Sequence, residues 1–267
     1  MYEDHYGLRH QPFGETVSPA AYVALPSRDA SLRRLHYGLR HGHGPAVLFG
    51  PPGSGKTLIA RCLAAELGVS AVHLTFPALP GAELLTLLAE EFGGPFTETP
   101  TMAVALRRLR DQLAATVSTG HHPLLIVDEA QVIQDPATFE TLRLLLNFAT
   151  TGPPDLALLL VGTAELILQL PPGLADRLTA RCLLSPFTES ESSAYVLGRL
   201  AAAGATTPLF TPEALAALHR AADGLPRRLN HLADLALLIA YAEGDPQADP
   251  RTIAIAAREF HLDTVAA

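Results

Sequence analysis

One octapeptide constrains this chain more than any other feature of its sequence, and it holds the single lysine among 19 basic residues. Residues 50–57 read Gly-Pro-Pro-Gly-Ser-Gly-Lys-Thr, which matches the pattern G-x-x-x-x-G-K-[ST] of a phosphate-binding P-loop. Glycines in such a loop let consecutive backbone N–H groups turn toward phosphate oxygens, and the helix that follows directs its positive dipole end at them. The motif predicts a nucleotide site; the alternative is a glycine-rich turn that binds nothing.

The chemistry of a P-loop gives each part of this motif an expected role. Lys56 is expected to reach the β- and γ-phosphates of ATP, and the Thr57 hydroxyl is expected to be a ligand of Mg²⁺. An apolar run at 46–49 predicts a buried strand before the loop, and 58–67 predicts a helix after it. The residues expected to bind the nucleotide are Gly50, Pro51, Pro52, Gly53, Ser54, Gly55, Lys56, Thr57 and Leu58.

Apolar runs and helical patterns alternate through the first part of the chain, and the strand pattern stops near residue 190. Alternation of this kind predicts an α/β fold with a parallel sheet covered by helices on both faces. The expected strands are 46–49, 71–76, 124–127, 156–161 and one that closes at 183–184. The expected organisation is an N-terminal arm at 1–27, a nucleotide-binding core at 28–187 and an all-helical lid at 188–267.

Two carboxylates directly follow the apolar run Leu-Leu-Ile-Val at 124–127, in the form of a Walker B motif. A strand in mid-sheet would deliver Asp128 to its carboxyl end beside the P-loop, where Asp128 is expected to hold Mg²⁺. Glu129 is expected to polarise the attacking water as a general base, which favours hydrolysis over binding alone. The alternative is an acidic pair that begins a helix.

Four further residues have expected roles that depend on where the fold places them. Thr163 ends the next apolar strand and is expected to contact the γ-phosphate or orient water (sensor 1), or to cap a helix. Arg177 and Arg181 precede the expected last strand, and either could stabilise the transition state in a neighbouring subunit; a solvated helix face is the alternative. Arg227 opens a lid helix and is expected to contact the nucleotide (sensor 2), or to be surface charge.

Composition excludes several classes of protein. The formal net charge is −8, and acidic residues exceed basic ones in both 1–187 and 188–267, which argues against coating nucleic acid by charge alone. The cluster of Arg107, Arg108 and Arg110 is a solvated face or a local patch for nucleic acid or a partner protein. No apolar stretch approaches the length of a membrane span, the N-terminus lacks a signal-peptide pattern, and two cysteines give no disulfide framework. A cytoplasmic protein without a membrane segment is expected.

Motifs spread over essentially the whole chain carry a further signal. They are Met1-Tyr2, Tyr6-Gly7-Leu8 and Pro12-Phe13, the P-loop, and the segments 126–131, 142–148, 161–162, 165–166, Arg177, Arg181 and 224–230. Together they resemble the ExeA-type (general secretion pathway A-like) AAA+ ATPases, a family similar in turn to transposition ATPases of the TnsC and MuB kind. The chain differs from the family's frequent P-loop at Pro51, Pro52 and Leu58, and has Thr163 where many members have glutamine.

The resemblance implies an AAA+ core with a helical lid, and ATP hydrolysis coupled to assembly of a homo-oligomer, as a ring or filament. It also implies that the N-terminal arm helps to enclose the adenine. The first hypothesis is an ATPase that powers or organises a cell-envelope or secretion system through a protein partner. The second is a DNA-associated regulator of transposition or replication, which the mild acidity does not favour. A third is a nucleotide-gated switch with negligible turnover.

Overall fold

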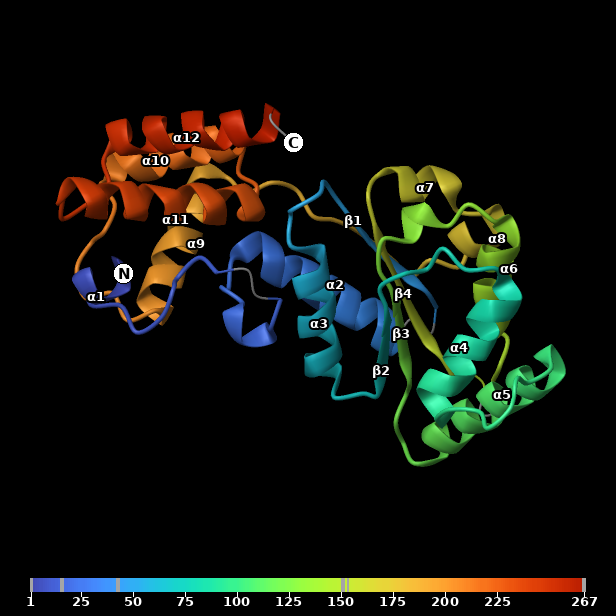
Figure 1. The fold of residues 1–267 in the computed structure, drawn as a ribbon. Coiled ribbons are helices and arrows are strands. Elements are labelled where there is room, and N and C mark those ends of the chain that lie inside the picture. Colours follow the sequence, from blue (N-terminus) through green and yellow to red (C-terminus); the bar gives the residue numbers. More distant parts are fainter. Residues whose placement is uncertain (1, 15–16, 42–43, 150–151, 153, 266–267) are drawn as a thin grey trace. The chain divides into compact units, whose positions relative to one another are not determined.

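The computed structural model describes residues 2–14, 17–41, 44–149, 152 and 154–265 (Figure 1). Its chain forms two compact units. The helical unit contains Met1–Arg28, Pro52–Gly55 and Ser185–Ala267, and the sheet unit contains Asp29–Pro51 and Lys56–Leu184. Within the described residues, no helix has the length and apolar character needed to cross a bilayer.

The sheet unit is built on five parallel strands in the order β2-β3-β4-β1-β5. The strands are β1 (Ala46–Phe49), β2 (Ala71–Leu74), β3 (Leu124–Val127), β4 (Ala157–Gly162) and β5 (Ala180–Leu183). This arrangement confirms the predicted α/β fold with a parallel sheet. Two strands differ from the prediction: β2 ends two residues earlier than expected, and β4 is shifted by one residue toward the C-terminus. β5 ends at Leu183, within the expected 183–184.

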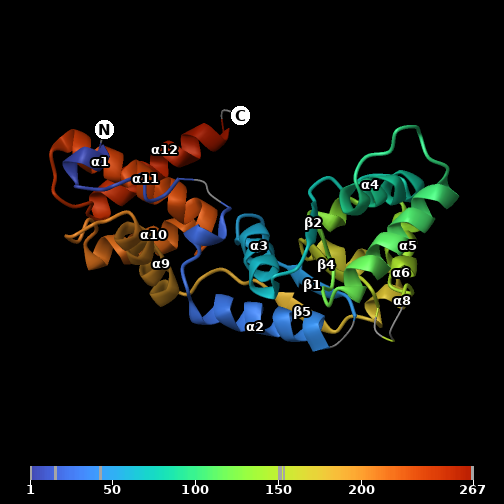
Figure 2. The ribbon, with the colours of Figure 1, turned by 90° about the horizontal axis from the view of Figure 1, so that it is seen from below.

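Helices cover both faces of this sheet, which explains why its strands read as continuous apolar runs (Figures 1 and 2). On one face lie α2 and α3, and on the other lie α4, α5 and α6. The helices of this unit are α2 (Pro26–His41), α3 (Lys56–Leu67), α4 (Gly81–Gly93), α5 (Met102–Ser118), α6 (Pro136–Leu145), α7 (Glu165–Gln169) and α8 (Pro172–Ala175). A 3₁₀ turn, η2 (Ala130–Val132), follows β3.

The strand register places side chains of one face in a single core. Leu160 of β4 pairs with Val47 of β1 and with Val127 of β3, and all three are buried in the cluster that includes Leu109 of α5 and Leu142 of α6. Burial of one such side chain contributes about 2 kcal/mol. Because the strands are parallel and in register, the chain leaves the sheet at the same edge after β1, β3 and β4.

The helical unit packs the N-terminal segment against the C-terminal helices. Its elements are α1 (Tyr2–His5), the 3₁₀ turn η1 (Pro19–Ala21), α9 (Glu189–Ala202), α10 (Pro212–Ala222), α11 (Pro226–Glu243) and α12 (Pro250–Val265). Thr188 and Glu191 form a capping box at the start of α9, and proline opens each of α10, α11 and α12. The C-terminal helices expected from the sequence are therefore present, and the expected lid domain at 188–267 stays a prediction.

The N-terminal segment is held by buried aromatic and hydrogen-bonding contacts. Tyr2, Tyr6 and Phe13 lie in the same hydrophobic cluster as the side chains of α9 to α12. The buried Arg199 of α9 donates to the carbonyl oxygens of Pro12 at 2.8 Å and Gly14 at 3.2 Å. The segment is thus an integral part of the helical unit.

Two glycines with positive φ give a test of packing in the helical unit. Gly224 (φ +65°) has no room for a side chain, since a Cβ would lie 2.4 Å from the Phe187 carbonyl oxygen, whereas Gly244 (φ +78°) has open space around it. We expect Gly244→Ala to cost about 1 kcal/mol of unfolding free energy, from backbone strain alone. Gly224→Ala should cost about 3 kcal/mol or more, because strain and a clash with backbone add.

Chemical denaturation of the two glycine variants and the unsubstituted protein measures this difference. Equal losses of unfolding free energy in Gly224→Ala and Gly244→Ala would contradict the tight approach of Phe187 to Gly224.

Candidate nucleotide-binding site

The P-loop connects β1 to α3 through two glycines in the left-handed region of backbone conformation. Gly53 has φ +77° and Gly55 has φ +92°, values that side chains disfavour, and α3 begins at Lys56. The Lys56 ammonium is buried and donates to the carbonyl oxygens of Gly50 at 3.0 Å and Pro51 at 3.1 Å. The loop therefore has the backbone shape that its glycine spacing predicts.

A hydrogen bond joins the P-loop helix to the end of β3. The Thr57 hydroxyl donates to Oδ2 of Asp128 at 2.7 Å, although β4 lies between β1 and β3 in the sheet. Oδ1 of Asp128 accepts the Glu129 N–H at 3.0 Å. The structure thus brings together the two residues that the sequence predicted as Mg²⁺ ligands.

Asp128 has a third partner that sequence reasoning missed. Nε2 of His73, in β2, lies 3.3 Å from Oδ2 of Asp128. Burial raises the pKa of Asp128, but the hydrogen bonds from His73, Thr57 and the Glu129 N–H outweigh burial, and the net effect is a lowered pKa. Asp128 is ionised at neutral pH, as a metal ligand must be. A polar residue inside the apolar run of β2 was the signal that could have identified His73.

Glu129 adopts a backbone conformation that few residues other than glycine accept. Its φ is 50° and its ψ is 37°, and its exposed side chain makes no capping bond to the turn that follows. The acidic pair therefore does precede a 3₁₀ turn, as the alternative interpretation expected, but the Glu129 side chain does not cap it. Nε2 of Gln131 instead donates to the Glu129 carboxylate at 2.6 Å. Strained backbone of this kind is typical of functional sites.

Gln131 links Glu129 to the end of β4, a connection that spacing alone could not predict. While its amide nitrogen holds Glu129, its Oε1 accepts the Thr163 N–H at 3.1 Å. Gly162 makes room for this side chain, because a Cβ at that position would lie 2.5 Å from Oε1 of Gln131. The ends of β3 and β4 are thereby held together by one amide side chain.

Thr163 lies where the sequence predicted, directly after β4, but it does not cap a helix. Its hydroxyl donates to Glu165 at 2.6 Å, while α7 is preceded by Ala164 with no side-chain cap. The helix-cap alternative for Thr163 is wrong, and the sensor role stays a prediction.

Arg177 and Arg181 do not share a helix face, which corrects the alternative interpretation of this pair. Arg177 follows α8 and donates to Oδ1 of Asn147 at 2.9 Å. Arg181 lies inside β5, not before it, and donates to the Ala175 carbonyl at 3.1 Å. Both side chains are exposed on the sheet unit. β5 pairs only with β1 and forms one edge of the sheet, so exposed residues on it are accessible to another chain.

Arg227 lies in the helical unit at the start of α11, as predicted. Its backbone N–H donates to the Gly53 carbonyl at 3.2 Å, and a Cβ at Gly53 would lie 3.0 Å from the Cβ of Arg227. The adjacent Arg228 forms an ion pair with Asp223, which supports a surface role for Arg228.

The donor set fits magnesium with a nucleotide rather than a metal held by protein alone. Among the described residues, no group of three or more His, Cys, Asp or Glu side chains could hold a metal ion. Mg²⁺ commonly uses one or two protein oxygens together with phosphates and water, and Thr57 and Asp128 supply such oxygens. The buried Ser54 hydroxyl within the loop has no hydrogen-bond partner in the structure.

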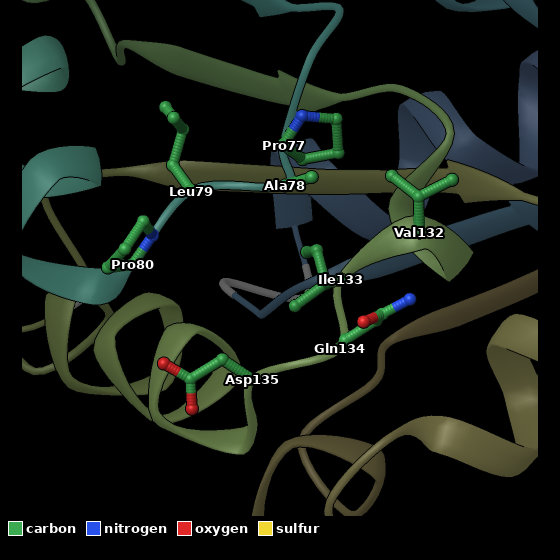
Figure 3. Close-up of a pocket in the computed structure, with 8 residues that line it drawn as sticks. All are labelled: Pro77, Ala78, Leu79, Pro80, Val132, Ile133, Gln134 and Asp135. Carbon is green, nitrogen blue, oxygen red and sulfur yellow. The ribbon is translucent and has the colours of Figure 1, made fainter.

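A separate hollow of about 420 Å³ lies in the sheet unit, between the loop after β2 and the segment after β3 (Figure 3). Apolar residues dominate its lining, which consists of 77–80 and 132–135. Its one carboxylate, Asp135, caps α6 by accepting the Ala137 N–H at 2.9 Å. The lining contains no basic side chain, and a carboxylate repels phosphate, so this hollow does not have the chemistry of a phosphate site.

Comparisons of the sequence with known proteins support the assignment of an AAA-type fold that contains the P-loop. The family model described as AAA domain matches residues 39–170. General secretion pathway protein A of Aeromonas hydrophila is 36% identical over 265 residues, covering 97% of this chain, and the chain spans 48% of that protein.

Solved structures resemble the chain at lower identity. Cdc6p of Pyrobaculum aerophilum has a TM-score of 0.73 at 21% identity, covering 91% of this chain and 70% of that one. The Aeropyrum pernix Orc1 protein in complex with DNA has a TM-score of 0.67 at 20% identity, covering 90% and 67%. The RuvB branch migration motor of Thermotoga maritima has a TM-score of 0.60 at 16% identity, covering 90% and 73%.

At these identities the solved structures establish the fold alone, an AAA+ P-loop core with C-terminal helices. The sequence match to General secretion pathway protein A, together with the AAA domain and the P-loop geometry, identifies the relatives. Over nearly its whole length this chain is therefore similar to the ExeA-type, or general secretion pathway A-like, AAA+ ATPases.

Proposed function

We propose that this protein binds and hydrolyses ATP with Mg²⁺ and converts the state of the nucleotide into assembly of a homo-oligomer. The observation that carries this proposal is the 2.7 Å hydrogen bond between Thr57 of the P-loop helix and Asp128 at the end of β3. It joins the two oxygen donors that a magnesium-nucleotide complex requires, next to the lysine of the loop.

Each candidate site residue of the sheet unit has a proposed role that its position supports. Lys56 neutralises charge on the β- and γ-phosphates, and Thr57 and Asp128 hold Mg²⁺, which would stabilise negative charge on the phosphates. Glu129 accepts a proton from the attacking water, and the amide of Gln131 orients its carboxylate. Thr163, linked through its backbone to Gln131, senses the γ-phosphate. Arg227 of the helical unit acts as sensor 2.

Assembly is proposed from the exposure of two guanidinium groups. Arg177 and Arg181 lie on the surface of the sheet unit, where either could reach the nucleotide of a neighbouring subunit in a ring or filament. A guanidinium supplied in trans stabilises transition-state charge only when subunits associate. The rate of hydrolysis would then depend on oligomerisation.

The cellular role is proposed from the family. The relative is named General secretion pathway protein A, and a secretion or cell-envelope assembly is therefore the proposed setting, with a protein partner. A cytoplasmic location agrees with two buried, unpaired cysteines, Cys62 and Cys182, whose pKa values burial raises. The thiols are therefore poorly reactive packing groups.

A DNA-associated role is the second candidate, because one similar structure is described in complex with DNA. The arginine cluster of α5 offers little support for it. Arg108 lies over the Phe96 ring at 4.3 Å and donates to the Gly93 carbonyl, and Arg110 pairs with Asp111 at 3.2 Å. The guanidinium groups of Arg108 and Arg110 therefore already interact with other residues of this chain. ATP-dependent DNA binding that weakens steeply with salt would favour the DNA role, and no binding at low salt would remove it.

Substitution of Glu129 separates hydrolysis from binding. We expect Glu129→Gln to keep ATP affinity and to lower turnover by about 10²- to 10⁴-fold, because the general base is lost. Lys56→Ala should abolish binding itself. Calorimetric titration with Mg·ATP and a phosphate-release assay measure the two quantities, and Glu66→Gln, exposed on α3, is the control. Unchanged turnover in Glu129→Gln would indicate a switch with negligible hydrolysis.

Dilution tests the arginine in trans. The rate per subunit should rise with protein concentration, and Arg177→Ala or Arg181→Ala should lose turnover while keeping ATP affinity. Mixing the inactive arginine variant with Glu129→Gln should restore activity, since one subunit supplies the base and its neighbour the guanidinium. A rate per subunit that stays constant on dilution, with no recovery on mixing, would rule out this arrangement.

A further inference from the structure

Arg28, in the first turn of α2, is a buried cation that the proposed mechanism does not use. Its side chain belongs to the helical unit and the residue is 4% exposed. Nη2 donates to the Ser185 carbonyl at 2.9 Å and to the Ser54 carbonyl of the P-loop at 3.4 Å. The guanidinium carbon lies 4.3 Å from the centroid of the Phe187 ring. One side chain thus contacts the P-loop and the segment that leads into α9.

Keeping a charge in this position is costly. Burial lowers the pKa of Arg28 to about 10, although the negative charge of Glu191 opposes that change, so the guanidinium stays charged at neutral pH. Its hydrogen bonds to Ser54 and Ser185 go to carbonyl oxygens, while the Glu191 carboxylate accepts the Ser27 N–H at 3.1 Å. An apolar side chain would fill the space at lower cost. A role other than packing explains the arginine better.

The contacts of the P-loop carbonyls determine where its N–H groups point. The Gly53 carbonyl accepts the Arg227 N–H at 3.2 Å, and the next carbonyl, that of Ser54, accepts from Arg28. In a planar trans peptide the carbonyl and the N–H of the following residue point in opposite directions. The N–H groups of Ser54 and Gly55 therefore point away from these two donors, and they are the groups that a P-loop offers to phosphate.

We propose that Arg28 is a positioning residue for phosphate binding, which holds the Ser54 carbonyl so that the Gly55 N–H is directed at the phosphates. The inference rests on the proposed nucleotide site. It adds a residue, outside the P-loop motif, that sets the orientation of the loop before nucleotide arrives. Preorganised donors bind more tightly because less ordering is needed on binding.

The geometry also explains why this position holds arginine rather than lysine. A planar guanidinium donates to two carbonyls and stacks on an aromatic ring, whereas an ammonium does neither in the same way. Phe187, under the guanidinium, donates its N–H to the Gly224 carbonyl at 2.8 Å, shortly before α11 and Arg227. Arg28 and Arg227 donate to the two loop carbonyls. Within the helical unit, Phe187 contacts Arg28 through its ring and, through its backbone, the Gly224 segment that precedes Arg227.

Nucleotide affinity of the full chain tests the inference. The variants are Arg28→Lys, which keeps the charge, and Arg28→Met, which removes it; Arg33→Lys, exposed on the same helix, is the matched control. Calorimetry with ADP in the absence of metal reports phosphate binding without the Mg²⁺ ligands. We expect Arg28→Lys to bind roughly tenfold more weakly, which corresponds to loss of one charge-assisted hydrogen bond. Arg28→Met should bind still more weakly, and the control should match the unsubstituted protein.

A second readout separates positioning from a merely structural role. In Arg28→Lys, KM for ATP should rise while kcat at saturating ATP stays within about twofold, because the catalytic groups are untouched. A lowered melting temperature with unchanged ADP affinity would overturn the inference and assign Arg28 to stability. If Arg28→Met does not fold, Arg28→Lys decides the question.

Failure of this inference is distinguishable from failure of the proposed function. If the unsubstituted protein binds ADP, Lys56→Ala does not, and Arg28→Lys binds like the unsubstituted protein, the nucleotide site stands and the role of Arg28 is wrong. If the unsubstituted protein takes up neither ADP nor Mg·ATP, the proposed function fails and the inference fails with it.

Discussion

The hydrogen bond between Thr57 and Asp128 depends on the strand order, and the candidate site depends on it in turn. Its partners are 71 residues apart in the chain and lie after strands that are separated by β4. Parallel pairing in register brings the ends of β1, β4 and β3 to one edge, so a short hydroxyl can reach the carboxylate. With His73 and the Glu129 N–H as further donors, Asp128 is kept ionised in a buried position.

A second set of contacts governs Glu129, the proposed base. Glu129 has a left-handed backbone conformation, and its carboxylate accepts a hydrogen bond from Gln131. The position of the carboxylate therefore depends on a residue outside the Walker B motif. The same amide group accepts the Thr163 N–H, so one side chain connects the end of β4 to Glu129. Such a connection is a physical route by which contact with the γ-phosphate could alter hydrolysis.

Within the helical unit, two arginines donate to the part of the P-loop that belongs to that unit. Arg227 and Arg28 bind consecutive carbonyls of the loop, from α11 and from the first turn of α2. The buried N-terminal segment belongs to the same unit, where Tyr2 and Phe13 share the core of the C-terminal helices. Segments from both ends of the chain therefore belong to the unit whose arginines contact the Gly53 and Ser54 carbonyls.

Local patterns in the sequence determined the P-loop, the Walker B carboxylates, the parallel sheet and the C-terminal helices, because glycine spacing and apolar periodicity act over a few residues. Tertiary structure alone decided the contacts of His73, Gln131 and Arg28, since each joins segments far apart in the chain. It also decided that Arg181 lies within β5 and not before it. Periodicity reports which face of an element is buried, but the partner of a polar side chain depends on strand order and packing.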